Sequence, residues 1–361
     1  MKVSVVVGGQ FGSEGKGAVV SYLARNLKPT DLNIRVAGPN AGHTVYDEHG
    51  RAWKLRQIPA GAVVSNCRLG IAAGSEVDLE VLASELWELG RAGYPIGARL
   101  AIHPAATVLE PQDIETEKQN RLSEQIGSTG KGIGAARARR IMRQAKTVGQ
   151  ATDLLCDVLD RYRVKVRPRV AAPIHADTPG SQLIIEGTQG YGLGLHTVYY
   201  PKVTSSDCRA IDFLAMAGIS PWAADVEKIE VWVVARVYPI RVAGDSGPLI
   251  HETTWEALGL PPERTTVTNK IRRVGQWDST LVRQAVAANG GYPAVRIALT
   301  MLDQKFPEVA GATNWAQIAK HPFAVRFIRK VESECGAPVR LVGTSPTTMV
   351  PVPARTTYLR G

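Results

Sequence analysis

The sequence predicts one large α/β domain over residues 1–361, with a central, mostly parallel sheet flanked by helices and a P-loop-like phosphate site. Two observations support this prediction: apolar runs of strand length alternate with patterns of helical period, and glycine-rich turns follow several of the runs. The expected strands cover residues 3–7, 69–73, 183–185, 231–237 and 294–299. The expected helices cover residues 18–26, 79–89, 152–162 and 279–288, and residues 110–134 form a long helix or an excursion.

The composition is that of a folded globular protein, since 44% of the 361 residues are hydrophobic and 21% are charged. No apolar run approaches the ~18 residues of a membrane helix, and the N-terminal run is too short for a signal peptide. The four cysteines are scattered, which indicates a reducing compartment and no structural zinc. We therefore expect a cytoplasmic protein with no membrane partner.

The net charge of +10 predicts polyanionic partners, either nucleic acid or a phosphate-rich small molecule. One basic cluster lies just past a glycine turn, on one expected helical stretch, and we interpret it as functional; it comprises Arg137, Arg139, Arg140, Arg143 and Lys146. A second cluster, over residues 161–169, alternates basic and apolar residues as a half-exposed strand does. Neither carries the interleaved aromatic residues of a base-stacking surface, and no stable nucleic-acid complex is expected.

The first glycine-rich turn joins the first expected strand to the first expected helix and reads GGQFGSEGKG at residues 8–17. Bare backbone N–H groups, a helix N-terminus and Lys16 together make a phosphate cradle. The turn departs from a Walker A loop, since Gln10 replaces its first glycine and Gly17 replaces the Mg²⁺-binding Ser or Thr. We interpret it as a phosphoryl-transfer site outside the standard pattern, although such turns also serve as packing devices.

A histidine loop and a second glycine loop follow along the chain. The loop GPNAGHT at residues 38–44 carries His43, which can act as a general acid, stabilise a developing oxyanion or satisfy a turn. The loop GSTGKGIG at residues 127–134 combines hydroxyls, a lysine and glycines. It suits a second phosphate site, to which Arg143 could add a charge-assisted contact, and a flexible loop is the alternative.

Three further motifs complete the set. The segment EGTQGYG at residues 186–192 follows an expected strand, and its Gln189 suits the reading of a base edge. The loop at residues 267–278 is rich in Lys and Arg and suits a carboxylate substrate. Asp303 lies at another strand end, where it could hold a purine edge or cap the next turn. The motifs together predict two phosphorylated ligands and an acid at the carboxyl edge of the sheet.

These six motifs, in this order, resemble adenylosuccinate synthetase over residues 3–346. That family phosphorylates the 6-oxygen of a purine monophosphate with a purine triphosphate and then displaces the phosphate with the amine of L-aspartate. The resemblance implies Mg²⁺, a homodimer and two nucleotide sites. The donor triphosphate would be held by Gly12, Gly15, Lys16, Gly17, Asp303, Thr344, Ser345 and Pro346. The acceptor nucleotide would be held by Ser13, Asn40, Ser128, Thr129, Gln189, Thr204 and Val242, with Arg143 from the other subunit.

The resemblance also implies roles in the reaction. The catalytic residues would be Ser13, Lys16, His43 and Gln189, with His43 donating a proton or hydrogen bond during transfer to O6. Mg²⁺ would lie beside Ser13 and the carbonyl of Gly42. The aspartate carboxylates would be received by Thr268, Lys270 and Arg272.

Ser13 stands where ordinary members of the family carry an aspartate that accepts the N1 proton of inosine monophosphate (IMP) and assists at Mg²⁺. Serine does neither well, because its hydroxyl pKa lies far above neutral. Serine is smaller and neutral, however, so it leaves room for the 2-amino group of guanine and can accept a hydrogen bond from it. We therefore expect the phage branch of the family, which acts on dGMP in the host cytoplasm on the route to 2-aminoadenine in DNA.

The sequence departs from the family pattern at two other positions, and three alternative interpretations stay open. Lys131 replaces an arginine of the family's second glycine loop, and Met301 replaces a lysine that helps to define a guanine pocket. The donor could therefore be ATP, dATP or GTP, with ATP favoured. The alternatives are an ordinary synthetase that acts on IMP, a relative in which Ser13 reflects either an inactive enzyme or a neutral drift from aspartate, and a nucleic-acid-binding NTPase.

Overall fold

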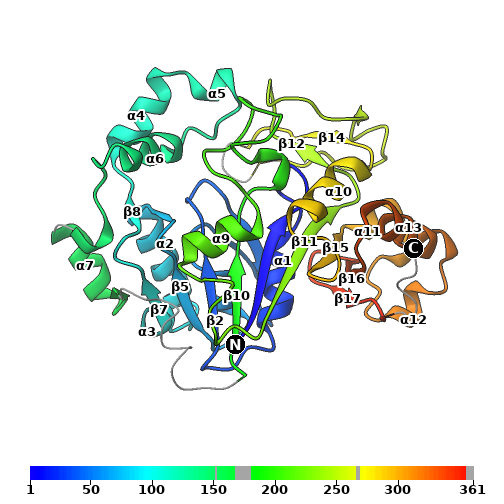
Figure 1. The fold of residues 1–361 in the computed structure, drawn as a ribbon, viewed down its shortest axis with the longest axis horizontal. Coiled ribbons are helices and arrows are strands. Elements are labelled where there is room, and N and C mark those ends of the chain that lie inside the picture. The colour runs from blue at the N-terminus through cyan, green and yellow to red at the C-terminus, as the bar shows by residue number, and fades with distance from the viewer. Residues whose placement is uncertain (151–152, 167–179, 266–268, 355–361) are drawn as a thin grey trace.

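The computed structural model describes residues 1–150, 153–166, 180–265 and 269–354. Its main feature is a ten-stranded sheet in the order β17-β16-β15-β11-β1-β10-β2-β5-β7-β9 (Figure 1). The strands are β1 (Lys2–Gly8), β2 (Leu32–Arg35), β5 (Arg68–Ile71), β7 (Leu100–Ile102), β9 (Lys165–Val166), β10 (Gln182–Glu186), β11 (Lys228–Arg236), β15 (Val295–Thr300), β16 (Val339–Gly343) and β17 (Met349–Pro351).

All pairings in this sheet are parallel except β16 with β17, at the edge. The predicted α/β fold with a mostly parallel sheet is therefore confirmed. The central strands are continuous apolar runs because helices cover both of their faces. In β1, for example, Val5, Val6 and Val7 are all buried.

The helices form two layers, one on each face of the sheet. Val3, Val5 and Val7 belong to one buried cluster with residues of α9, α10 and α13, whereas Val6 belongs to a second cluster with residues of α1, α2, α3 and α7. This alternation follows from the strand geometry, in which successive side chains point to opposite faces. The helices are α1 (Lys16–Ala24), α2 (Leu79–Arg91), α3 (Ile96–Arg99), α7 (Asp153–Arg161), α9 (Ala210–Ala217), α10 (Ser279–Ala288), α11 (Leu302–Lys305), α12 (Trp315–Ile318) and α13 (Pro322–Cys335).

Two excursions lie above the carboxyl ends of the central strands (Figure 1). One consists of α4 (Pro111–Gln119), α5 (Leu122–Gln125) and α6 (Ile133–Ile141). The other is an antiparallel sheet of β12 (Ile240–Arg241), β14 (Arg273–Gly275) and β13 (Glu252–Thr253). Two smaller pairs are β3 (His43–Tyr46) with β4 (Ala52–Leu55), and β6 (Glu76–Val77) with β8 (Thr107–Val108). The expected excursion over residues 110–134 is thus two helices, which are separated at Arg121 by a left-handed residue with φ 51°.

The two basic clusters differ from expectation. Residues 161–169 do not form one strand, because Arg161 ends α7 and β9 is two residues long; residues 167–169 lie outside the described part. The first cluster is not one helical stretch either, since α6 ends at Ile141. Within it, Arg137 pairs with Glu76 at 2.7 Å and Arg139 pairs with Asp113 at 2.6 Å. Our functional interpretation is wrong for these two arginines, because their charges fasten α6 to β6 and α4.

Among the helices that the structure describes, none combines the length and the apolar character that crossing a bilayer requires.

Candidate functional site

A cavity of about 690 Å³ opens at the carboxyl ends of the strands, and this volume is within the range of small-molecule sites. Almost all the predicted site residues line it, although they come from segments more than 300 residues apart. They are Gly12, Ser13, Gly15, Lys16, Gly17, Asn40, Gly42, His43, Ser128, Thr129, Gln189, Thr204, Val242, Lys270, Arg272, Asp303, Ser345 and Pro346. Thr268 lies outside the described residues, and Thr344 and Arg143 do not line the cavity.

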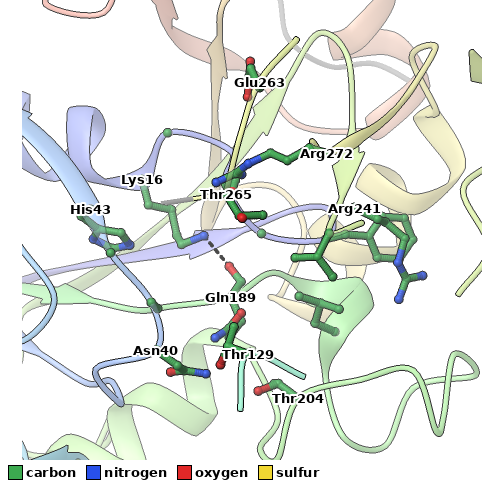
Figure 2. A pocket seen from close by; sticks show the side chains of 18 of the residues that line it. Lys16, Asn40, His43, Thr129, Gln189, Thr204, Arg241, Glu263, Thr265 and Arg272 are labelled. Carbon is green, nitrogen blue, oxygen red and sulfur yellow. Dashed lines mark hydrogen bonds between the residues drawn. The ribbon is translucent and has the colours of Figure 1, made fainter. Parts of the chain in front are cut away.

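The phosphate loop is organised around the fully buried carboxylate of Glu14. This carboxylate accepts hydrogen bonds from the backbone N–H of Gln10 at 3.1 Å and of Gly12 at 2.7 Å. It also pairs with Lys16 Nζ at 2.6 Å, and Lys16 donates a second bond to the carbonyl of Gln189 (Figure 2). Lys16 is therefore held at the end of β1 with its charge balanced, and a phosphate entering the cavity would compete with Glu14 for it.

Gly17 explains why this loop lacks the Ser or Thr of a Walker A motif. A Cβ atom at residue 17 would lie 2.9 Å from Cβ of His43 and 3.0 Å from the carbonyl oxygen of Thr44. The histidine loop therefore packs directly against the first turn of α1, and only glycine fits between them. The same close approach places His43 beside the phosphate loop.

Ser13 lies on the wall of the cavity, between the glycines of the phosphate loop. It is exposed and has a left-handed backbone with φ 57°. Asp and Asn tolerate this backbone region better than Ser does. The backbone therefore gives no reason for serine at this position.

His43 is buried against a fixed pair of charges. Its Nδ1 lies 2.5 Å from Oε1 of Glu186, and Arg35 pairs with the same carboxylate. The other oxygen of Glu186 accepts the N–H of Ala60 at 2.8 Å. Nδ1 also lies 3.0 Å from the guanidinium of Arg35. Both of these contacts are on Nδ1, so Nε2 is the ring nitrogen left for a ligand.

The titration of His43 follows from these surroundings. Burial, together with the nearby charge of Arg35, lowers the pKa of His43 from 6.5 to about 4, although Glu186 opposes this shift. The imidazole is therefore neutral at pH 7. A bound phosphate would add negative charge near the ring and raise the pKa again, which would favour the form that donates from Nε2.

One part of the second glycine loop has a structural role, and another part lines the cavity. The backbone N–H groups of Gly132 and Gly134 donate to the buried carboxylate of Glu117 at 2.9 and 2.7 Å, which fastens this part of the loop to α4. Ser128 and Thr129 line the cavity. Figure 2 shows Thr129 close to Asn40 and Thr204 on one side of the contact between Lys16 and Gln189. The hydroxyl and amide groups of these residues can bind the phosphate and base of one nucleotide.

The basic loop contributes Lys270 and Arg272 to the cavity wall. Figure 2 shows Arg272 on the other side of the contact between Lys16 and Gln189. Burial lowers the pKa of Arg272, yet its charge persists at neutral pH because the ordinary value is 12.5. Two cations at a cavity wall suit a ligand with two carboxylates.

Sequence reasoning missed five charged residues of the cavity, which are Glu117, Lys202, Arg241, Glu263 and Arg264. Glu263 precedes the basic loop, and Arg241 follows β11 with its guanidinium 4.1 Å from the ring centroid of Phe11. Burial lowers the pKa of Arg241 to about 10. Arg241 could have been predicted as a cavity residue, because it is adjacent in the sequence to the predicted site residue Val242. Nothing in the local sequence distinguishes Glu263 from a surface glutamate.

The donor-side residues lie at the ends of β15 and β16. Asp303, Ser345 and Pro346 line the cavity, and burial raises the pKa of Asp303. Thr344 lies beneath them, fully buried, and its hydroxyl donates to the carbonyl of Ala312 at 2.7 Å. Its side chain therefore supports the loop from below, and contact with a ligand remains a prediction for its backbone alone.

Arg143 lies just beyond the end of α6, away from the cavity of its own chain. Its side chain is exposed and donates to the carbonyl of Ile141 at 2.7 Å, with φ 62° at its backbone. Ile141 and Met142 beside it are 68% and 64% exposed. These features agree with a role toward another subunit, which stays a prediction.

The donor atoms near the phosphate loop suit Mg²⁺. Ser13 offers a hydroxyl and Gly42 a carbonyl, and both residues line the cavity. Within the described ranges, no group of three or more His, Cys, Asp or Glu could hold a metal ion. Mg²⁺ usually takes few protein ligands and completes its octahedron with phosphate oxygens and water. The residues present therefore fit an ion that binds together with the triphosphate.

Comparison with known proteins identifies close relatives. The family model for adenylosuccinate synthetase matches residues 5–171 and 152–317. Adenylosuccinate synthetase of Pyrococcus sp. (strain ST700) is 37% identical over 350 residues, which cover 96% of each chain. That of Methanocaldococcus jannaschii is also 37% identical over 350 residues, covering 95% of this chain and 94% of the relative.

Two solved structures are similar along nearly the whole chain. One is succinoaminodeoxyadenylate synthetase (PurZ) of cyanophage S-2L, bound to dGMP and to dATP as an energy donor. Its TM-score is 0.78 at 26% identity, with 98% of this chain and 96% of that chain covered. The other is a fully ligated adenylosuccinate synthetase of Plasmodium falciparum, with a TM-score of 0.80, 19% identity and coverage of 97% and 100%. At that identity, the second structure bears on the fold alone.

Proposed function

Because the chain belongs to the adenylosuccinate synthetase family, and is thus a C–N bond-forming ligase of purine nucleotide biosynthesis, we propose that it joins L-aspartate to C6 of dGMP. The product would be 2-amino-N6-succinyl-dAMP, and a purine triphosphate would be hydrolysed in its formation. The observation that carries the proposal is the small, neutral Ser13 on the cavity wall. The cyanophage PurZ supports it, since that neighbour binds dGMP.

The first step would transfer a phosphoryl group. The 6-oxygen of dGMP attacks the γ-phosphorus of the triphosphate, and the nucleoside diphosphate leaves. Lys16 and the amides of the phosphate loop hold the transferring group, and Nε2 of His43 donates to the oxygen. Mg²⁺, held by Ser13 and Gly42, would neutralise charge on the phosphates.

In the second step, the amine of aspartate attacks C6 and the phosphate leaves with the former 6-oxygen. Lys270 and Arg272 hold the two carboxylates so that the amine faces C6. Thr268 would assist them. This arrangement needs the residues proposed for aspartate and those proposed for the acceptor to line one cavity; Lys270 and Arg272 line the same cavity as Asn40 and Gln189.

The N1 proton of the base must leave during the first step. Glu14 is a poor acceptor in this structure, because it does not line the cavity and already accepts bonds from Gln10, Gly12 and Lys16. We therefore assign the proton to a water molecule or to the substrate aspartate.

The remaining residues would hold the two nucleotides. Ser128 and Thr129 would bind the 5′-phosphate of the acceptor, together with Arg143 of the partner subunit in a homodimer. Asn40, Gln189, Thr204 and Val242 would hold its base and sugar, and Asp303, Ser345 and Pro346 would surround the donor purine. The cavity places Met301 beside Asp303, where family members that use GTP carry a lysine, and we favour ATP or dATP as the donor.

A product assay tests the proposal directly. Purified protein is incubated with L-aspartate and Mg²⁺, with dGMP or IMP as acceptor and with ATP, dATP or GTP as donor. We expect the succinylated product from dGMP and from ATP or dATP. Turnover of IMP with none of dGMP would instead identify an ordinary synthetase, the activity named for the archaeal relatives at 37% identity.

A nucleic-acid-binding NTPase predicts a different outcome: hydrolysis that DNA or RNA stimulates without aspartate and that weakens with salt. The structure favours this function less, because Arg137 and Arg139 are occupied by ion pairs within the chain.

The substitution Arg272→Ala should raise the KM for aspartate by about 10-fold or more, because a charge-assisted contact with a carboxylate is lost. The KM for dGMP should change little. Steady-state kinetics with each substrate varied in turn measures both. Arg273→Ala is the matched control: Arg273 is adjacent, pairs with Glu252 at 2.5 Å and does not line the cavity. A similar rise in both KM values would show that Arg272 supports the whole cavity and not aspartate in particular.

A further inference from the structure

Arg236, the last residue of β11, brings a buried charge to the base of the cavity. Its side chain is fully buried, and its guanidinium contacts three segments that are distant in sequence. It donates to the carboxylate of Glu263 at 2.9 and 2.5 Å, and it approaches the carbonyl of Ser13 at 3.5 Å and the side chain of Gln304 at 3.4 Å. One arginine thus joins the phosphate loop, the aspartate side and the donor side.

The backbone of Arg236 is fixed to the phosphate loop by Gln10. The side-chain amide of Gln10 donates to the carbonyl of Arg236 at 3.0 Å, and its oxygen accepts the N–H of Arg236 at 2.9 Å. This paired contact gives Gln10 a role that its place in the glycine-rich turn did not suggest. The guanidinium therefore projects from a point that cannot move independently of the phosphate loop.

Glu263 is in turn connected to Arg272 through the backbone. The carbonyl of Glu263 accepts the backbone N–H of Arg272 at 2.9 Å, and the carbonyl of Arg272 accepts Nε1 of Trp255 at 2.7 Å. The ends of the basic loop are thus held together next to the pair of Arg236 and Glu263. Any displacement of Glu263 would be passed directly to the backbone of Arg272.

The charges explain why a carboxylate is tolerated beside a site for a dicarboxylic acid. Burial alone would raise the pKa of Glu263, but the hydrogen bonds and charge of Arg236 hold it below its usual range. Glu263 is therefore ionised at neutral pH, and its charge is engaged by Arg236.

We propose that Arg236 and Glu263 are positioning residues that fasten the aspartate-binding loop to the phosphate loop and hold Arg272 at the cavity wall for the substrate. The inference rests on the proposed function in one respect, that aspartate is the acid bound. It assigns neither residue to the reacting atoms. Its consequence is that loss of the pair impairs aspartate binding and leaves the binding of the acceptor nucleotide nearly unchanged.

The test substitutes Glu263→Gln, which retains the size of the side chain and removes the charge. We expect the KM for aspartate to rise about 10-fold, with the KM for the acceptor monophosphate within about 2-fold of the parent. Hydrogen exchange of the Arg272 amide should become faster, while exchange in β1 stays the same. The matched control is Glu252→Gln, which breaks the pair with Arg273 outside the cavity and should change neither quantity.

Two measures keep the outcomes distinguishable. The kinetics use whichever acceptor, dGMP or IMP, supports turnover, so a wrong acceptor assignment does not affect this test. If neither acceptor consumes aspartate, the proposed function fails, and hydrogen exchange still reports on the connection between the loops. If Glu263→Gln does not fold, Arg236→Lys replaces it in the test. This variant retains the positive charge but loses the bidentate geometry of the guanidinium, so it should show the same effects more weakly. An unchanged aspartate KM, together with unchanged exchange at Arg272, would overturn the proposal.

Discussion

Replacing Ser13 by aspartate should shift the preference between dGMP and IMP by on the order of 10²-fold, measured as the ratio of the two kcat/KM values. A carboxylate at residue 13 crowds the space that the 2-amino group of guanine needs. It also restores a group that can accept the N1 proton of IMP. Turnover of dGMP should therefore fall, and turnover of IMP should appear or rise.

The backbone makes this substitution a clean test. Residue 13 is left-handed, with φ 57°, and aspartate and asparagine adopt this region more readily than serine. A loss of dGMP use in Ser13→Asp therefore reflects the side chain and not strain. Ser13→Asn separates the two effects of aspartate, since it has nearly the same shape without the charge. Equal use of dGMP by the parent and by Ser13→Asp would remove the main support for dGMP as the acceptor.

Replacing His43 by alanine should lower kcat by on the order of 10²-fold or more, because a group that donates to the reacting oxygen is removed. Affinity for the two nucleotides should change by much less. Steady-state kinetics and equilibrium binding of each nucleotide separate these quantities. The control is His196→Ala: His196 also pairs with a carboxylate, Asp207 at 2.6 Å, but it is exposed and does not line the cavity. Equal losses in kcat and in nucleotide affinity would argue that His43 merely shapes the site.

The pH dependence of stability supplies a second readout for His43. Its pKa in the folded protein is about 4, below the 6.5 of an unfolded chain, so the unfolded state binds more protons between these values. The contribution of His43 to stability is thus complete above pH 6.5 and is lost as the pH falls toward 4. His43→Ala should lose less stability than the parent across this interval. Urea unfolding at a series of pH values, with His196→Ala as control, measures the difference.

The sequence by itself indicated the fold and most of the cavity. The apolar runs located the central strands to within a few residues, because a buried parallel strand must be apolar on both faces. The glycine-rich turns marked the phosphate loop and the second glycine loop, since close approach of backbone leaves few other residues possible. At Gly17 this constraint is visible as a Cβ position 2.9 Å from His43. Each of these signals depends on residues that are neighbours in the chain.

Only the tertiary structure decided which charged side chains face the cavity. Arg137 and Arg272 look alike in the sequence, yet one is paired with Glu76 and the other faces the cavity. Likewise, Glu263 gained a role only because β11 ends beside it and presents Arg236. An ion pair depends on the distance between two side chains after packing, and a contact between Gln10 and Arg236 spans 226 positions of the chain. Local patterns cannot supply that distance, because it is set by the order of strands in the sheet.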